Sequence, residues 1–117
     1  MELDSYLTNP RITLHEWGQM KWFADEKIWQ GVDVSMAMMT VYPGKTSESH
    51  YHGNCHEVIH VLQGEVNQAV GENVIHLTKG DTCVIPPNTR HCSENKQNSE
   101  AILLLSYSEG ERNYEII

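Results

Sequence analysis

Residues 50–60 read HYHGNCHEVIH, a run that holds four histidines, one cysteine and one glutamate in a chain of 117 residues. A strand over residues 48–52 would place His50 and His52 on the same face, because successive side chains of a strand point to opposite sides. Two imidazoles at positions i and i+2 can converge on one metal ion. Residues 53–55 then predict a turn, which leads into a second strand.

That second strand, expected over residues 57–62, presents Glu57 and His60 on opposite faces, so the two side chains cannot reach the same ion. A shift of one residue after the turn would present His56 in place of Glu57, and the residues alone leave that choice open. His91 is the best remaining ligand, because it follows the rigid turn PPNTR and begins another expected strand. Three imidazoles and one carboxylate suit Mn, Fe, Co, Ni or Zn better than Ca or Mg.

Beyond residue 30, short runs of β-branched or alternating apolar residues recur, and each is closed by Gly, Pro or Asn. A spacing of about 8–12 residues between such runs is typical of an all-β sandwich or barrel. No apolar stripe at helical spacing is long enough to predict a helix there, so any helix is expected within the first thirty residues. The expected strands cover residues 34–42, 48–52, 57–62, 65–69, 74–78, 82–85, 91–94 and 101–107.

These segments resemble the two sequence motifs of the cupin family. The first motif, G(X)5HXH(X)3-4E(X)6G, is matched from Gly44 to Gly64 without a departure. The second motif, G(X)5PXG(X)2H(X)3N, is matched from Gly80 to Asn95, with Asn88 in place of a turn glycine. That exchange is mild, because asparagine tolerates the left-handed backbone conformation that such a turn needs.

The resemblance implies a double-stranded β-helix, the jelly-roll barrel of small single-domain metal-binding cupins. It also implies one divalent transition metal ion per chain (Mn, Fe, Ni, Co or Zn), bound inside the barrel by His50, His52, Glu57 and His91. The histidines and cysteines that match no ligand position, and that we expect to be packing, surface or incidental residues, are His15, His60, His76, Cys55 and Cys92.

The length of the chain predicts one domain. We expect the cupin barrel over residues 31–117 and an N-terminal arm over residues 1–30 that packs on the barrel or on a partner subunit. The arm carries all three tryptophans, and large aromatic side chains dominate contacts of this kind. The arm and the tail at residues 111–117 suggest a homodimer, although the tail is equally well read as a final edge strand of its own barrel.

The formal net charge is −8, from 16 acidic and 8 basic residues, and no run of Lys or Arg forms a basic stripe. Nucleic-acid and membrane partners are therefore not expected. Three cysteines without a CxxC pair favour free thiols in a reducing compartment. No uncharged apolar run approaches the length of about 20 residues that a membrane span requires, so we expect a cytoplasmic protein.

Many reactions share the cupin fold, so the fold alone cannot name one. Because all four ligand positions are kept, the resemblance favours a metal-dependent enzyme of the dioxygenase, isomerase, lyase or decarboxylase type that acts on a small molecule. The ion would act as a Lewis acid or as an oxygen-binding site. The alternative is a non-catalytic cupin that uses its metal to bind or sense a small molecule.

The expected strand over residues 34–42 should turn one of its two faces into the barrel. Either face would give a mostly apolar pocket with one hydroxyl group, suited to a small and partly hydrophobic ligand. The residues that handle protons are unknown at this point. Tyr42, His56 and Tyr107 are candidates only by their chemistry.

Overall fold

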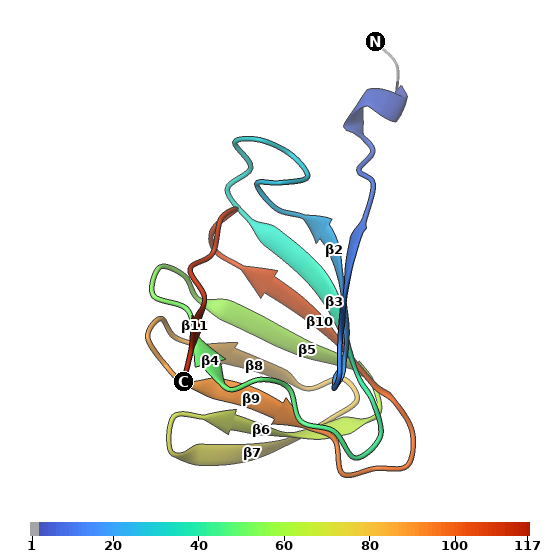
Figure 1. Ribbon diagram of the computed structural model, residues 1–117, viewed down its shortest axis with the longest axis vertical. Helices are drawn as coiled ribbons and strands as arrows, with labels where there is room; N and C mark the ends of the chain where they lie inside the picture. Colours follow the sequence, from blue (N-terminus) through green and yellow to red (C-terminus); the bar gives the residue numbers. More distant parts are fainter. Residues whose placement is uncertain (1–2) are drawn as a thin grey trace.

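The computed structural model describes residues 3–117, which form two antiparallel β-sheets that face each other (Figure 1). The six-stranded sheet has the order β1 (Arg11–His15), β2 (Gly18–Ala24), β3 (Ser35–Val41), β10 (Ala101–Tyr107), β5 (Glu57–Gln63), β8 (Thr82–Ile85). The five-stranded sheet has the order β11 (Glu115–Ile116), β4 (His50–Tyr51), β9 (His91–Glu94), β6 (Glu65–Val70), β7 (Asn73–Thr78). The all-β prediction is confirmed.

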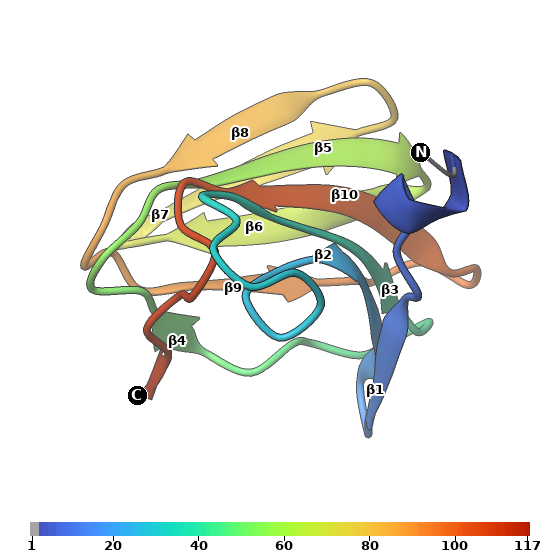
Figure 2. The same cartoon turned by 90° about the horizontal axis from the view of Figure 1, so that it is seen from above.

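The one helix among the described residues is a single 3-10 turn, Leu3–Tyr6. Within residues 3–117, no helix has the length and apolar character that crossing a membrane requires. The expected strands over residues 82–85, 91–94 and 101–107 match β8, β9 and β10 residue for residue. Strands β1 and β2 were not expected from the sequence, and their hairpin extends the six-stranded sheet (Figure 2). Residues 1 and 2 of the expected N-terminal arm lie outside the described range.

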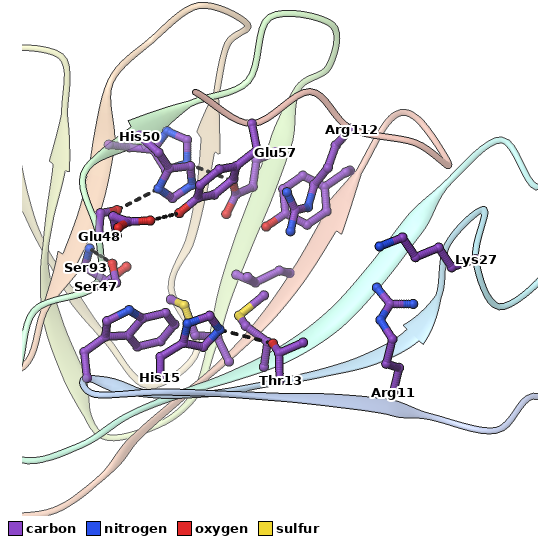
Figure 3. Close-up of a pocket in the computed structure, with 17 residues that line it drawn as sticks. Arg11, Thr13, His15, Lys27, Ser47, Glu48, His50, Glu57, Ser93 and Arg112 are labelled. Carbon is purple, nitrogen blue, oxygen red and sulfur yellow. Dashed lines mark hydrogen bonds and ion pairs between the residues drawn. The ribbon is translucent and has the colours of Figure 1, made fainter. Parts of the chain in front are cut away.

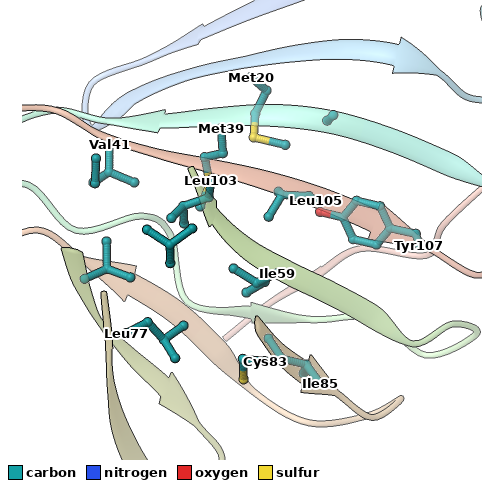
Figure 4. Close-up of a cluster of buried hydrophobic side chains, with 14 of the residues drawn as sticks. Met20, Met39, Val41, Ile59, Leu77, Cys83, Ile85, Leu103, Leu105 and Tyr107 are labelled. Carbon is teal, nitrogen blue, oxygen red and sulfur yellow. The ribbon is translucent and has the colours of Figure 1, made fainter. Parts of the chain in front are cut away.

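The core lies between the two sheets and follows the alternation of the strands (Figure 4). In β10, every second side chain is buried, from Ala101 to Tyr107. In β3, the buried face is Ser35, Ala37, Met39 and Val41, which decides between the two faces that the sequence left open. Burying one aliphatic side chain of this size contributes about 1.5–3 kcal/mol. The largest fully buried apolar side chains are Ile59, Ile85, Leu103, Leu105, Val41, Val61 and Val66.

Two turn residues of the cupin-like motifs have backbone conformations that explain their identity. Gly64 has a φ of +76°, and a Cβ there would lie 2.9 Å from the carbonyl oxygen of Glu100. Asn88, which stands where the family motif has glycine, has a φ of 58° and so adopts the expected left-handed conformation. Its backbone N–H donates to the carbonyl of His52 at 2.7 Å, which fixes this turn beside the end of β4.

Asp25 organises the loop that follows β2. Its carboxylate accepts two hydrogen bonds from the Arg11 guanidinium, at 3.0 and 2.5 Å. It also accepts the backbone N–H groups of Lys27 and Ile28, each at 3.0 Å. One largely buried side chain thus ties β1 to the loop that carries Lys27.

We expect Asp25→Asn to lower the free energy of unfolding at pH 7 by about 1.5–3 kcal/mol, the value of a charge-assisted hydrogen bond. Burial alone raises the pKa of Asp25, but the Arg11 guanidinium and the N–H groups of the loop outweigh burial and hold the pKa below 3.8. The folded pKa is therefore the lower one, so this stabilisation is present above about pH 4 and is lost as the pH falls through the folded pKa.

Urea unfolding of the wild-type protein and of Asp25→Asn, at pH 7 and at pH 3, measures this effect. The difference in their free energies of unfolding should be smaller at pH 3. Asp33→Asn is the matched control, because Asp33 is exposed, and it should change the free energy by less than about 0.5 kcal/mol. Equal losses for the two substitutions, or a loss independent of pH, would contradict the role given to Asp25.

Candidate metal centre

Strand pairing brings together side chains from both sheets. In the five-stranded sheet, His50 on β4 lies opposite His91 on β9, and His52 follows β4 directly. Glu57 belongs to the six-stranded sheet, where it begins β5. One ligand atom of each of the four residues lies within 4.8 Å of the others, so the group could hold a metal ion.

The three imidazoles are fixed in the same tautomer. A backbone carbonyl can only accept a hydrogen bond, so each nitrogen that contacts one must carry the proton. In a neutral imidazole the other nitrogen, Nε2, is then left with a free lone pair, which is the arrangement of metal-binding histidines. The Nδ1 contacts are His50 to Glu48 O at 2.7 Å, His52 to Asn113 O at 2.7 Å and His91 to Thr89 O at 2.9 Å.

The Nε2 atoms of His52 and His91 meet at the carboxylate of Glu57. Its Oε1 lies 3.1 Å from Nε2 of His52 and 2.9 Å from Nε2 of His91, and all three side chains are almost completely buried. The contact with His91 is not aligned as a hydrogen bond, so this buried nitrogen has no hydrogen-bond partner. Buried polar atoms without a partner are rare in proteins. A metal ion among the four residues would supply the missing partner.

The electrostatics of the centre favour a positive charge. Burial alone would raise the pKa of Glu57, but the imidazoles of His52 and His91 outweigh burial and lower it to about 2. Burial lowers the pKa of His50 to about 4, so its lone pair is free at neutral pH. Burial would also lower the pKa of His91, yet the Glu57 carboxylate raises it. The centre therefore combines a permanent carboxylate with at least one neutral imidazole.

Residues near the C-terminus complete the walls of the centre. The ring of Tyr114 stacks on His50 with a centroid distance of 4.4 Å, and its hydroxyl donates to Glu48 Oε1 at 2.8 Å. Tyr107 packs its ring against the edge of His52, at 5.1 Å. The tail continues as β11, whose Ile116 pairs with His50 on β4. Within this chain, the tail is thus an edge strand of its own barrel.

A cavity of about 320 Å³ lies beside the four-residue group and is lined by three of its members, His50, Glu57 and His91. Figure 3 shows His50, Glu48 and Ser47 on one side of this cavity and Arg11, Lys27 and Arg112 on the other. The apolar side chains of Met20, Met39 and Leu105 also line the cavity. The cavity is large enough for a small molecule.

The other candidate residues lie outside the group. His56 is exposed, while Glu57 is buried within the group, so the one-residue shift considered for this segment does not occur. Tyr107 lines the cavity, and Tyr42 does not. Five further residues were expected not to bind the metal, and they too lie outside the group: His15, His60, His76, Cys55 and Cys92.

Several residues that line the cavity were not indicated by the sequence, among them Arg11, Lys27, Glu48, Arg112 and Tyr114. They come from β1, two loops and the C-terminal segment, and they meet only because the barrel closes. No spacing rule within the sequence could have grouped them.

Comparison with known proteins gives the family and the fold. A family model described as "Cupin domain" matches residues 37–107. An uncharacterized protein of Methanocaldococcus jannaschii is 35% identical over 81 residues, which are 68% of this chain and 65% of that protein.

Three solved structures share the architecture. An oxalate decarboxylase of Bacillus subtilis superposes with a TM-score of 0.82 at 21% identity, over 92% of this chain and 30% of that one. The Lactobacillus farciminis oxalate decarboxylase in its formate complex gives 0.84 at 21% identity, over 92% and 33%. An oxalate oxidase gives 0.79 at 22% identity, over 90% and 57%. The likeness confirms the jelly-roll barrel, and this chain spans less than two thirds of each of these chains and of the archaeal relative.

We expect Tyr114→Ala to raise the pKa of His50 from about 4 towards its ordinary value of 6.5, because the stacked ring is part of what buries this imidazole. Tyr114→Phe keeps the ring and should leave the pKa nearly unchanged. NMR titration of the histidine ring protons in chelator-treated protein measures both. Tyr51→Ala is the control, because Tyr51 lies next to His50 on β4. An equal shift of the His50 pKa in all three variants would contradict the role given to the Tyr114 ring.

Proposed function

This chain belongs to the cupin family, and from that premise we propose that it is a metal-dependent enzyme acting on a small molecule. His50, His52, Glu57 and His91 would hold one divalent transition metal ion (Mn, Fe, Co, Ni or Zn) through three imidazole nitrogens and a carboxylate. The supporting observation is that backbone carbonyls hold the Nδ1 atoms of all three imidazoles, while one ligand atom of each imidazole and of the buried Glu57 carboxylate lie within 4.8 Å of one another.

When bound, the ion supplies a Lewis acid or an oxygen-binding site for chemistry of the dioxygenase, isomerase, lyase or decarboxylase type. The chain's own residues would position the substrate and exclude water. Met39 and Leu105 give the cavity an apolar wall. Burial raises the pKa of Tyr107 well above its usual range, so its phenol keeps its proton beside His52. The Tyr114 hydroxyl holds its proton towards Glu48.

We also propose that the protein is a cytoplasmic homodimer whose N-terminal arm, residues 1–30, contributes contacts besides those it makes with its own barrel. Edge strand β1 exposes Ile12 and Leu14 to 54% and 75%, and exposed apolar side chains on an edge strand favour association. Cys55, Cys83 and Cys92 are free thiols, which suits a reducing compartment. A monomeric mass in light scattering would contradict the dimer.

The ligand assignment predicts that untagged protein binds about one transition-metal ion per chain by elemental analysis. His50→Ala, His91→Ala and Glu57→Gln should each weaken metal binding by more than about 100-fold, because loss of even a supporting partner of a ligand costs about 10–100-fold. The matched controls are His56→Ala and His60→Ala, which should keep full occupancy. Full occupancy in the three ligand variants would refute the assignment.

The same preparations separate an enzyme from a binding module. Protein reconstituted with each metal in turn is screened with dioxygen, sugar acids, thiols, and α-hydroxy or keto acids. We expect product from wild-type protein and none from His91→Ala. Saturable binding without product in every combination would favour the alternative, a non-catalytic cupin that senses a small molecule.

A further inference from the structure

The cavity beside the metal centre carries an unusual share of the chain's positive charge. The chain has only eight basic residues and a net charge of −8, yet Arg11, Lys27 and Arg112 all line this one cavity. Among the described residues, the carboxylates that line it are Glu48 and Glu57. Figure 3 shows the three cationic side chains along the side that faces His50 and Glu48. Such clustering in an acidic chain favours an anionic ligand.

Arg112 is held in this cavity by aromatic rings and not by an acid. Its Cζ lies 4.4 Å from the ring centroid of Trp22, 5.3 Å from that of Tyr107 and 5.2 Å from that of Tyr114. Within residues 3–117, no carboxylate lies within ion-pair distance of it. The faces of aromatic rings attract the positive charge of a guanidinium. They do not form hydrogen bonds with its five N–H groups, which point outward in the guanidinium plane. Those donors are available to a bound oxyanion.

The two other cations of the cavity, Arg11 and Lys27, differ in whether an acidic residue pairs with them. Arg11 is already paired with Asp25, so its charge is largely compensated within the chain. Lys27 has no ion pair among the described residues, and the Asp25 hydrogen bond to its backbone N–H fixes the start of its side chain at the cavity. Arg112 and Lys27 are therefore the uncompensated pair.

The rest of the cavity lining includes apolar and aromatic side chains. Among them are Met20, Met39 and Leu105, together with the stacked pair His15 and Trp17, whose ring centroids are 4.6 Å apart. A ligand with a short apolar segment would find apolar and aromatic contacts in the same cavity as the cations.

We propose that the substrate is a small organic acid with two carboxylates joined by a short apolar segment. This inference rests on the proposed metal-dependent function: one carboxylate would bind at the centre formed by His50, His52, Glu57 and His91. The second carboxylate binds the guanidinium of Arg112, with Lys27 beside it. Arg112 is thus the residue that selects a diacid over a monoacid.

The test is calorimetric titration of Mn(II)-loaded protein with malonate, succinate and glutarate, each compared with its monomethyl ester. At least one diacid should bind at least about tenfold more tightly than its ester, the effect of one charge-assisted hydrogen bond. Arg112→Gln should abolish that preference while leaving binding of the ester and the metal content unchanged. Arg112→Lys should restore part of it, and Lys27→Gln should reduce it.

Lys79→Gln is the matched control, because it removes one positive charge from an exposed turn away from the cavity. It should leave the preference for the diacid intact. If Arg112→Gln fails to fold, Lys27→Gln carries the test, since Lys27 is exposed and its removal should not affect folding. Equal binding of diacid and ester, no measurable binding of either, or an equal effect of Lys79→Gln would overturn the inference.

The two proposals fail in different ways. Wild-type protein that holds no metal refutes the proposed function, and the diacid inference falls with it. Wild-type protein that holds metal but does not discriminate diacid from ester refutes the diacid inference alone.

Discussion

The carboxylate of Glu57, buried between the imidazoles of His52 and His91, is the interaction on which the rest of this barrel depends. Glu57 belongs to the six-stranded sheet, whereas the histidines lie in or beside strands of the five-stranded sheet. A buried carboxylate without partners would cost several kcal/mol, since transfer of a charge out of water is unfavourable. The contacts with His52 and His91 offset this cost and so favour the arrangement of the two sheets that brings the imidazoles to Glu57.

The directions of the imidazoles depend in turn on backbone carbonyls from three separate parts of the chain. Glu48 precedes β4, Thr89 precedes β9, and Asn113 precedes β11. The carbonyls for His50 and His91 lie two residues before each histidine, so those contacts are local, whereas the carbonyl for His52 comes from a segment 61 positions away and requires the closed barrel. The C-terminal segment is part of this arrangement, because it supplies the third carbonyl and the ring that covers His50.

Alternation and turn residues were sufficient to predict the central strands, because β3, β5 and β10 bury every second side chain in the core. The same logic failed for β1, where the inward face is Arg11, Thr13 and His15, which line a cavity. The apolar residues of β1, Ile12 and Leu14, lie on its exposed face, so its alternation is the reverse of that of a strand packed on the core.

Motif spacing placed Glu57 and not His56 in the four-residue group. The cationic side of the cavity was beyond sequence reasoning, because Arg112 and Lys27 are 85 positions apart in the sequence and meet at no recognisable spacing.

The central claim is that the two sheets close around one metal ion. The most direct test is an anomalous difference map from crystals grown with Mn(II), recorded on both sides of the manganese absorption edge. The account predicts one peak per chain, in contact with Nε2 of His50, His52 and His91 and with the Glu57 carboxylate. A peak at Cys55 or Cys92, or none among these four residues, would contradict it.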